Sequence, residues 1–325
     1  MKVLLFSPDT FGYYTKIINM MESKGHSVDW INHIYVKSNF DRVKSRLMPS
    51  LTSKLTEKNF INEIDWQGDY ELIVVIKGEG LSEFLLDKMK QTFSKAKFVY
   101  YSWDSLSNVK GAKGKFKYFD AIKSFDRVDC LNIEHLEYLP LFYSKEYSRK
   151  ANSVTDNKYS AAFVGTLHSN RFSDVLGMAY LVEKNLNKPA FTFFYYPSKP
   201  VFKVLKVINK SFRNVPIEEV SFDKLSAQDV SRVMCDSEVI IDYGHPDQTG
   251  LTMRTIETLG INKKLITNNK LVMEEPFYKA ENVFVIGEKN EQELTQFLTS
   301  PYVPVSNEVY ESYSIENWVE RLIQC

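Results

Sequence analysis

Short apolar runs alternate with segments of helical periodicity along most of this chain, and the alternation restricts the possible folds more than any other feature. The strongest run is Leu72–Ile76, and residues 3–6 form another near the start. A strand that is apolar on both faces is typical of a parallel sheet covered by helices on both sides. The sequence therefore predicts an α/β protein assembled from βαβ units.

The alternation occurs in two halves, and 325 residues suit about two domains. Residues 144–158 are polar without apolar periodicity and predict a linker. We expect two Rossmann-like βαβ domains facing a cleft, residues 1–150 and residues 151–307. The predicted strands are residues 3–6, 28–31, 70–76, 98–102 and 121–125, then 161–164, 191–195, 238–243, 264–267 and 283–286, with residues 138–141 as strand or loop. The predicted helices include residues 81–93, 172–184, 226–235, 250–260 and 314–323.

Composition excludes several classes of protein. Forty-one Lys and Arg residues balance 41 Asp and Glu residues, so no global charge attracts nucleic acid. Cys130, Cys235 and Cys325 are scattered and form no CxxC pair, which indicates a reducing compartment. No run reaches the roughly 18 apolar residues of a membrane span, and residues 1–6 are too short for a signal sequence. We expect a cytoplasmic protein that at most lies peripherally on the inner face of the plasma membrane.

Residues 238–269 contain a predicted strand, a polar loop and a helix that is expected to begin at Gly250. The N-terminus of a helix attracts anions because its first N–H groups have no partner within the helix. His245 lies in the loop, while Thr252 and Arg254 would lie in the first turn, where a hydroxyl and a guanidinium add to the grip on a diphosphate.

Glu257 follows Arg254 by one helical turn, so both side chains lie on one face of the predicted helix. A carboxylate there could accept two hydrogen bonds from a ribose diol. The alternative is a plain helix that carries a surface Arg–Glu pair, which is a common arrangement.

A second candidate anion site follows the strand predicted at residues 161–164. Gly165, Thr166 and Arg171 come between that strand and the next helix, an arrangement that is typical of phosphate-binding turns. The alternative is a helix capped by Ser169. Neither a GxGxxG nor a Walker motif is present, which disfavours dehydrogenases and kinases.

Carboxylates follow three predicted strands of the first half. A transfer to a hydroxyl with inversion needs a general base, and Asp9, Glu79 and Asp104 are the candidates. Glu79 lies between two glycines after the most apolar strand and is favoured narrowly. Trp103 could stack on an acceptor sugar, whereas turn and cap chemistry is the alternative for all these residues.

No HExxH, CxxC or DxD motif is present, so the sequence predicts chemistry without a metal and without a cofactor. Residues 199–213 carry apolar residues interspersed with cations and no acidic residue. Such a helix could lie on anionic lipid, or it could pack its apolar side on the second domain.

Residues 238–269 resemble the nucleotide-sugar signature of GT-B glycosyltransferases, in which a glycine-led helix carries a ribose-binding glutamate and is followed by a glycine, here Gly260, and a strand. The order of elements is similar to that fold over nearly the whole chain. The second half resembles the CgeB-like and group-1-like glycosyltransferases of bacterial capsule and lipopolysaccharide biosynthesis.

The resemblance implies that Glu257 binds ribose, and that Gly250, Thr252 and Arg254 flank the diphosphate. It also implies that the loop of Gly165, Thr166 and Arg171 faces the diphosphate, and that the last helix, within residues 308–325, packs back on the first domain. Group-1 relatives carry a second glutamate eight residues before the ribose glutamate, where this chain has Thr249. Retention or inversion of the sugar configuration therefore stays open.

We expect a glycosyltransferase that moves a sugar from a nucleoside-diphosphate donor to a growing surface polysaccharide or lipid-linked glycan. Two alternatives remain at this point: a two-lobed nucleotide- or sugar-binding protein without catalysis, and an isomerase of the nucleotide-sugar 2-epimerase type.

Overall fold

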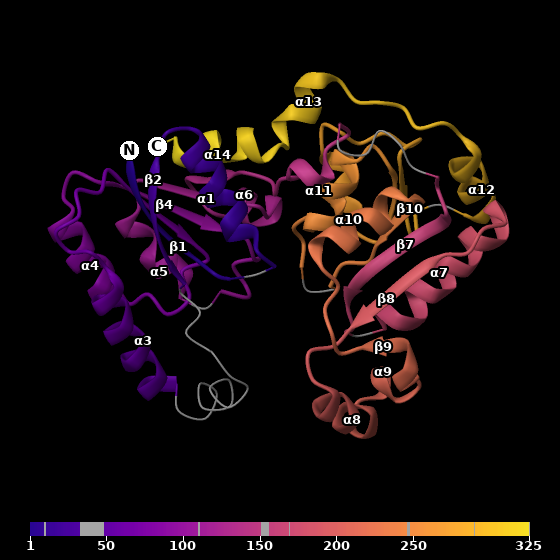
Figure 1. Ribbon diagram of the computed structural model, residues 1–325, viewed down its shortest axis with the longest axis horizontal. Coiled ribbons are helices and arrows are strands. Elements are labelled where there is room, and N and C mark those ends of the chain that lie inside the picture. Colours follow the sequence, from indigo (N-terminus) through magenta and orange to yellow (C-terminus); the bar gives the residue numbers. More distant parts are fainter. Residues whose placement is uncertain are drawn as a thin grey trace. The chain divides into compact units, whose positions relative to one another are not determined.

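The chain folds into two α/β units, which a computed structural model describes for residues 1–9, 11–32, 49–109, 111–150, 156–168, 170–245, 248–288 and 290–324 (Figure 1). Residue contacts group Met1–Pro140 with Ile315–Cys325 as unit 1, and Leu141–Ser314 as unit 2. Each unit contains one six-stranded parallel sheet. The predicted α/β class with two Rossmann-like domains is thereby confirmed.

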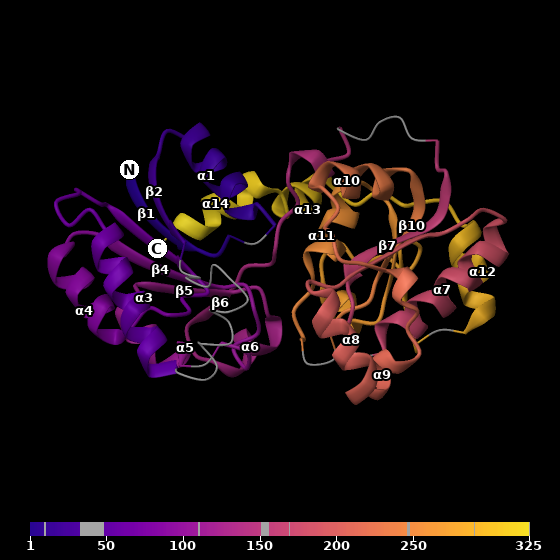
Figure 2. The same cartoon turned by 60° about the horizontal axis from the view of Figure 1, so that its bottom comes forward.

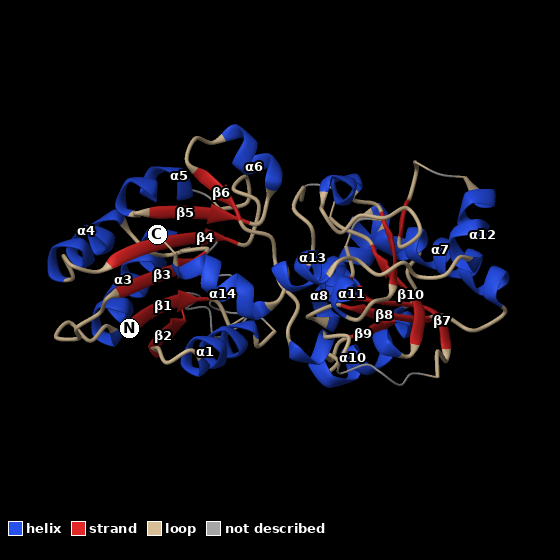
Figure 3. Cartoon of the chain, turned by 90° about the horizontal axis from the view of Figure 1, so that it is seen from above, coloured by secondary structure: helices blue, strands red, loops and turns tan. Residues whose placement is uncertain are grey.

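The sheet of unit 1 has the strand order β2-β1-β3-β4-β5-β6 (Figure 3). Its strands are β1 (Lys2–Ser7), β2 (Ser27–Asn32), β3 (Leu72–Ile76), β4 (Lys97–Ser102), β5 (Ala121–Ser124) and β6 (Leu136–Tyr138). Its helices are α1 (Tyr13–Ser23), α3 (Pro49–Glu63), α4 (Glu83–Thr92), α5 (Ala112–Lys115), α6 (Arg127–Asn132) and α14 (Ile315–Ile323), with a 3-10 turn, η1 (Phe116–Tyr118).

Helices cover both faces of this sheet, which explains why its central strands are apolar throughout. Side chains of one face pack with Phe60 of α3 and with Leu85 and Met89 of α4 in one buried cluster. On the other face lie α1 and α14, which contact each other (Figure 3). Burying both faces removes the polar-out alternation of a solvated sheet.

Helix α14 is fixed to unit 1 by an aromatic residue and a buried cation. Trp318 is 1% exposed and packs edge-on against Tyr101 of β4, with ring centroids 5.1 Å apart. The Lys123 ammonium donates to the carbonyls of Arg321 (2.6 Å) and Gln324 (2.9 Å). Carbonyls at the end of a helix have no partner within it, so a buried cation stabilises this end.

The sheet of unit 2 has the order β12-β11-β10-β7-β8-β9. Its strands are β7 (Tyr159–Thr166), β8 (Phe191–Tyr195), β9 (Val220–Ser221), β10 (Ser237–Asp242), β11 (Lys264–Thr267) and β12 (Val283–Val285). Its helices are α7 (Arg171–Leu186), α8 (Lys199–Ile208), α9 (Lys210–Arg213), α10 (Ala227–Cys235), α11 (Met253–Gly260), α12 (Glu291–Thr299) and α13 (Asn307–Ser312). The 3-10 turns are η2 (Lys145–Tyr147), η3 (Ile217–Glu219) and η4 (Lys270–Glu274).

The chain reverses its direction of travel across this sheet between two central strands. It runs outward from β7 through β8 to β9, and then returns to pair β10 beside β7 before continuing to β11 and β12. Ligands of open α/β sheets bind at the carboxyl ends of the strands at such a switch point. The ends of β7 and β10 are therefore the place to examine for a site.

Several predicted boundaries are wrong. Residues 145–147 of the expected linker form η2, where the Glu146 carbonyl accepts a hydrogen bond from Ser231 (2.9 Å) within unit 2. The basic segment 199–213 is two helices, because Asn209 ends α8 and caps α9. Of residues 138–141, expected as strand or loop, only Tyr138 belongs to a strand, β6, and residues 139–141 are loop. Strand β7 continues through Gly165 and Thr166, which were expected in a loop.

Candidate functional site

Arg171 joins the two strands at the switch point of unit 2. Its Nη1 donates to the carbonyl of Thr166, the last residue of β7, at 2.7 Å. Its Nη2 donates to the carbonyl of Tyr243, the residue after β10. The guanidinium is thus held between the carboxyl ends of β7 and β10, with neutral carbonyls as partners.

The Arg171 guanidinium retains an N–H group without a partner. Its Nε is buried and forms no hydrogen bond. Burial lowers the pKa of Arg171 to about 10, against the opposing effect of the Asp242 carboxylate, so the side chain is still cationic at neutral pH. Gly165 provides the space for this arrangement, since a Cβ there would lie 3.2 Å from Nη1 and 2.7 Å from Phe163.

Two histidines lie beside this guanidinium. The rings of His168 and His245 are 4.6 Å apart between centroids, and His245 is exposed. The Nδ1 of His168 is buried without a hydrogen bond. Burial, followed by the charges of Arg171 and His245, lowers the pKa of His168 to about 3, so its imidazole is neutral at physiological pH.

Asp242 links the end of β10 to the start of α11. This buried carboxylate accepts hydrogen bonds from the hydroxyls of Thr252 (2.6 Å) and Thr255 (2.7 Å). Thr252 is the N-cap of α11, and its oxygen accepts from the N–H of Thr255 at 3.3 Å. The predicted placement of Thr252 in the first turn, with the helix starting at Gly250, is therefore wrong. Gly250 is buried before the cap, and its carbonyl accepts from Asn269.

Arg254 and Glu257 form an ion pair on α11, with Nη1 and Oε2 2.8 Å apart. The alternative of a surface pair is wrong in one respect, because the Glu257 side chain is only 1% exposed. Arg254 also contacts the sulfur of Met234 and hydrogen-bonds Tyr147. A ribose diol would have to share the carboxylate with the guanidinium or replace it.

The glycine at the end of α11 allows η2 to approach the helix. A Cβ on Gly260 would lie 2.7 Å from Tyr143 Cγ and closer still to the Tyr147 carbonyl. The Gly260 carbonyl accepts a hydrogen bond from Tyr310 at 2.9 Å. Gly260 therefore has a packing role in unit 2.

In unit 1, two of the three predicted carboxylates converge on a lysine that sequence reasoning missed. The Lys77 ammonium lies 3.2 Å from Glu79 and 3.2 Å from Asp104. Burial alone would lower the pKa of Lys77, but the two carboxylates outweigh that effect and raise it. Asp9 is exposed after β1 and is not among the described partners of Lys77.

The backbone after β3 is strained where it presents these groups. Lys77 has φ 68°, and Gly78 and Gly80 also have positive φ. A left-handed conformation is unfavourable for lysine and is retained only where the surroundings enforce it. Trp103, the candidate for sugar stacking, lies edge-on to Tyr13 with centroids 6.1 Å apart.

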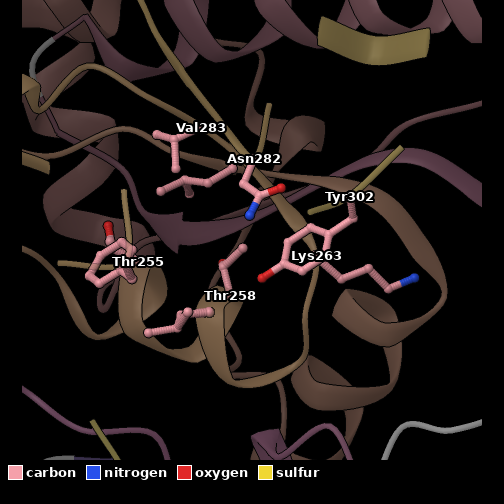
Figure 4. A pocket seen from close by; sticks show the side chains of 9 residues that line it. Thr255, Thr258, Lys263, Asn282, Val283 and Tyr302 are labelled. Carbon is pink, nitrogen blue, oxygen red and sulfur yellow. The ribbon is translucent and has the colours of Figure 1, made fainter. Parts of the chain in front are cut away.

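Among the described residues, a metal site, a large cavity and a membrane-spanning helix were also sought. No group of three His, Cys, Asp or Glu side chains is arranged to hold a metal ion there. A cavity beside α11 and β12 has a volume of about 10 Å³, enough for about one water molecule and far too small for a nucleotide (Figure 4). In the part of the chain that is described, no helix is long and apolar enough to cross a membrane.

Comparison with solved structures assigns the fold. A UDP-GlcNAc 2-epimerase from Methanocaldococcus jannaschii matches 99% of this chain and 98% of its own, with a TM-score of 0.57 and 12% identity. An alpha-glucosyltransferase in complex with UDP and DNA matches 98% of this chain and 94% of its own, with a TM-score of 0.56 and 11% identity. Anabaena HepE in complex with UDP matches 99% and 98%, with a TM-score of 0.54 and 12% identity.

The protein has the GT-B fold. The matches extend over nearly the whole chain and include the two six-stranded sheets. No protein-family model and no curated protein sequence matches the chain. At 11–12% identity the likeness concerns the fold, and the chemistry has to be argued from the chain's own residues.

Proposed function

We propose that the protein is a glycosyltransferase that uses a nucleoside-diphosphate sugar as donor. The observation that carries the proposal is Arg171, a half-buried cation held by two neutral carbonyls at the switch point of unit 2, with its Nε buried and unpartnered. Structures of the same fold were solved with UDP, which supports a uridine nucleotide as the first donor to test.

The residues around Arg171 suit the departure of a diphosphate. Breaking the bond between the sugar C1 and the phosphate oxygen leaves negative charge on the diphosphate, which a fixed guanidinium stabilises without reorganisation. Gly165 and Thr166, the last residues of β7, and His245, which follows β10, are the further donor candidates at these strand ends. Gly250, Thr252 and Arg254 remain the candidates that flank the diphosphate from α11, and Glu257 is the candidate for the ribose.

The acceptor hydroxyl forms the new bond to C1 and loses its proton. In an inverting reaction Glu79, Asp104 or Asp9 would take that proton, and their place at strand ends of unit 1 supports this role. We infer a surface polysaccharide or lipid-linked glycan of the capsule or lipopolysaccharide type as acceptor, and a cytoplasmic location, from the family resemblance. The zero net charge supports the absence of nucleic acid among the partners.

Titration with nucleotides tests the proposal. We expect UDP or a UDP-sugar to raise the melting temperature and to give a binding isotherm by calorimetry. Replacing Arg171 with alanine removes a charge-assisted contact and should weaken binding roughly 10- to 100-fold. Arg213→Ala, an exposed arginine of α9, is the matched control and should bind as the wild type does. Equal affinity of Arg171→Ala and wild type would remove the donor assignment.

The ribose role of Glu257 needs its own variant. Glu257→Gln keeps the shape of the side chain and removes its charge, so it should weaken the binding of UDP and should not weaken the binding of pyrophosphate, because the paired Arg254 stays in place. Asp229→Asn, an exposed carboxylate of α10, serves as control. An unchanged affinity for UDP in Glu257→Gln would contradict the assignment.

A 2-epimerase is the second candidate, since a UDP-GlcNAc 2-epimerase matches the chain with a TM-score of 0.57. An epimerase needs no acceptor. Incubation with a nucleotide sugar alone, followed by product analysis, separates the two: an epimeric nucleotide sugar supports the isomerase, and transfer only after an acceptor is added supports the transferase. Tight binding without either product would favour a non-catalytic binding protein.

A further inference from the structure

Helix α8 exposes an apolar face that no described residue covers. Val201, Val204, Val207 and Ile208 are 49%, 58%, 74% and 70% exposed, and they recur at the helical spacing of one side. The opposite side is the one that packs, because Phe202 is fully buried in the core of unit 2. The helix therefore has two apolar faces, and only one of them serves the core.

Position in the fold makes the exposed face accessible. Helices α8 and α9 follow β8 and lie at the end of unit 2 beside β9, the last strand of its sheet (Figures 1 and 2). Phe202 and Phe212 attach them to the unit through contacts with Tyr196. The apolar face and the anchoring phenylalanines thus belong to different sides of this helical pair.

Cations border the exposed apolar face. Lys203, Lys210 and Arg213 are exposed and take part in no ion pair among the described residues. The five cations between residues 199 and 213 are accompanied by no acidic residue, and the next acids along the chain are Glu218 and Glu219 of η3. This local excess of positive charge occurs in a chain whose net charge is zero.

We propose that α8 and α9 dock on the surface of an anionic phospholipid bilayer. The four exposed aliphatic side chains would enter the boundary between headgroups and acyl chains, while Lys203, Lys210 and Arg213 contact the anionic headgroups. An anionic bilayer presents an apolar layer beneath negative headgroups, and this combination matches an exposed aliphatic face that is flanked by cations. This docking is independent of the donor chemistry proposed above.

Vesicle sedimentation tests the proposal with the full chain. Wild-type protein should sediment with vesicles of phosphatidylcholine and phosphatidylglycerol, and much less with vesicles of phosphatidylcholine alone. Lys203→Glu and Lys210→Glu should each weaken the partitioning several-fold, and added salt should weaken it further. Val204→Asp with Val207→Asp should abolish it. Lys184→Glu and Tyr180→Ser, at exposed positions of α7, are the matched controls and should bind as wild type does.

A tryptophan probe shows which segment inserts. Val207 is 74% exposed. The fluorescence of a Val207→Trp variant should therefore shift to shorter wavelength when anionic vesicles are added. Calorimetry with UDP on the same variants separates a docking defect from misfolding. The proposal would be overturned in favour of another site if Val204→Asp/Val207→Asp sedimented with vesicles as wild type does. It would be overturned in favour of an interface between copies of this chain if wild type self-associated in analytical ultracentrifugation and did not bind vesicles.

Discussion

The carboxyl edges of the two sheets differ in the groups that surround their cation. In unit 1 the cation is Lys77, and two carboxylates lie within 3.2 Å of it. In unit 2 the cation is Arg171, whose hydrogen-bond partners are neutral carbonyls. A cation that is already neutralised offers little to an incoming anion, whereas one held by dipoles retains its attraction. The same sheet architecture therefore carries one edge whose cation is neutralised by carboxylates and one whose cation is held by neutral dipoles.

The largest expected effect concerns the independence of the two units. Trp318→Ala removes a buried indole from α14 and should destabilise unit 1 by about 3–5 kcal/mol. Hydrogen exchange followed by mass spectrometry should show faster exchange in peptides of residues 1–140 and little change in residues 141–314. Glu320 lies on the same helix as Trp318 and forms a surface ion pair with Lys24. Glu320→Ala should therefore lower the free energy of unfolding by less than about 1 kcal/mol. Equal loss of protection in both units would show that they unfold together.

A glycine from each unit sharpens the comparison of packing. Gly260→Ala forces a Cβ into the backbone of η2, so unit 2 should lose about 3 kcal/mol. Gly78→Ala in unit 1 meets the Val75 side chain at 2.8 Å and a left-handed φ, and should cost about 1–2 kcal/mol. Gly177→Ala on α7 has open space around it and should stabilise by about 0.5–1 kcal/mol. Chemical denaturation measures all three, and a neutral Gly260→Ala would contradict the close approach.

Removing the cation of unit 1 tests the difference between the edges directly. Lys77→Met should leave the affinity for UDP within about twofold of wild type, because two carboxylates already neutralise this lysine. The same variant should slow glycosyl transfer if Lys77 positions Glu79 or Asp104. Calorimetry and a transfer assay on one preparation give both values. If Lys77→Met lost as much affinity for UDP as Arg171→Ala, the donor site would have to be assigned to unit 1 instead of unit 2.

The smallest effect concerns pH. Burial, with Arg171 and His245, lowers the pKa of His168 to about 3 in the folded state, against 6.5 ordinarily. The unfolded chain then binds a proton that the folded chain rejects, so the stability of unit 2 should fall as the pH falls from about 6.5 toward 3. Because His168 is only partly buried, the free energy of unfolding should change with pH by well below the full value of about 1.4 kcal/mol per pH unit.

Matched variants isolate this contribution. His168→Gln should flatten the acid side of the stability profile, measured by denaturation at a series of pH values. His135→Gln, at a side chain that is 84% exposed in unit 1, should leave the profile as it is. Identical profiles for His168→Gln and wild type would mean that the imidazole is solvated.

The sequence was most informative about the buried strands. The strand predicted at residues 70–76 contains the observed strand Leu72–Ile76. It was predictable because residues covered on both faces have to be apolar, and that composition is readable without a structure. Helix α3 was missed, since its apolar residues follow no clear 3.6-residue period. Helix α12 was also missed, although Asn290 and Glu293 form a capping box that could have identified it.

For the candidate site, the sequence suggested residues but not the contacts that join them. A glycine followed by polar residues after a strand pointed to Gly165 and Arg171. The bond from Arg171 to the Tyr243 carbonyl joins positions 72 residues apart, and no spacing rule contains such a contact. Asp242 was read as part of an apolar strand, and Lys77 was passed over in favour of the carboxylates that surround it. Sequence patterns report local chemistry, whereas pairing across a sheet depends on strand order.

Unit 1 also has a consequence for synthesis on the ribosome. Its sheet is encoded before residue 140, but Trp318 and the carbonyls that hold Lys123 come after all of unit 2. Residues 1–140 therefore leave the ribosome with the Tyr101 face and a buried lysine still uncovered. Unit 2 is complete at residue 314, so the second unit can finish folding before the first. Unit 1 therefore gains its last helix only after the whole of unit 2 has been synthesised.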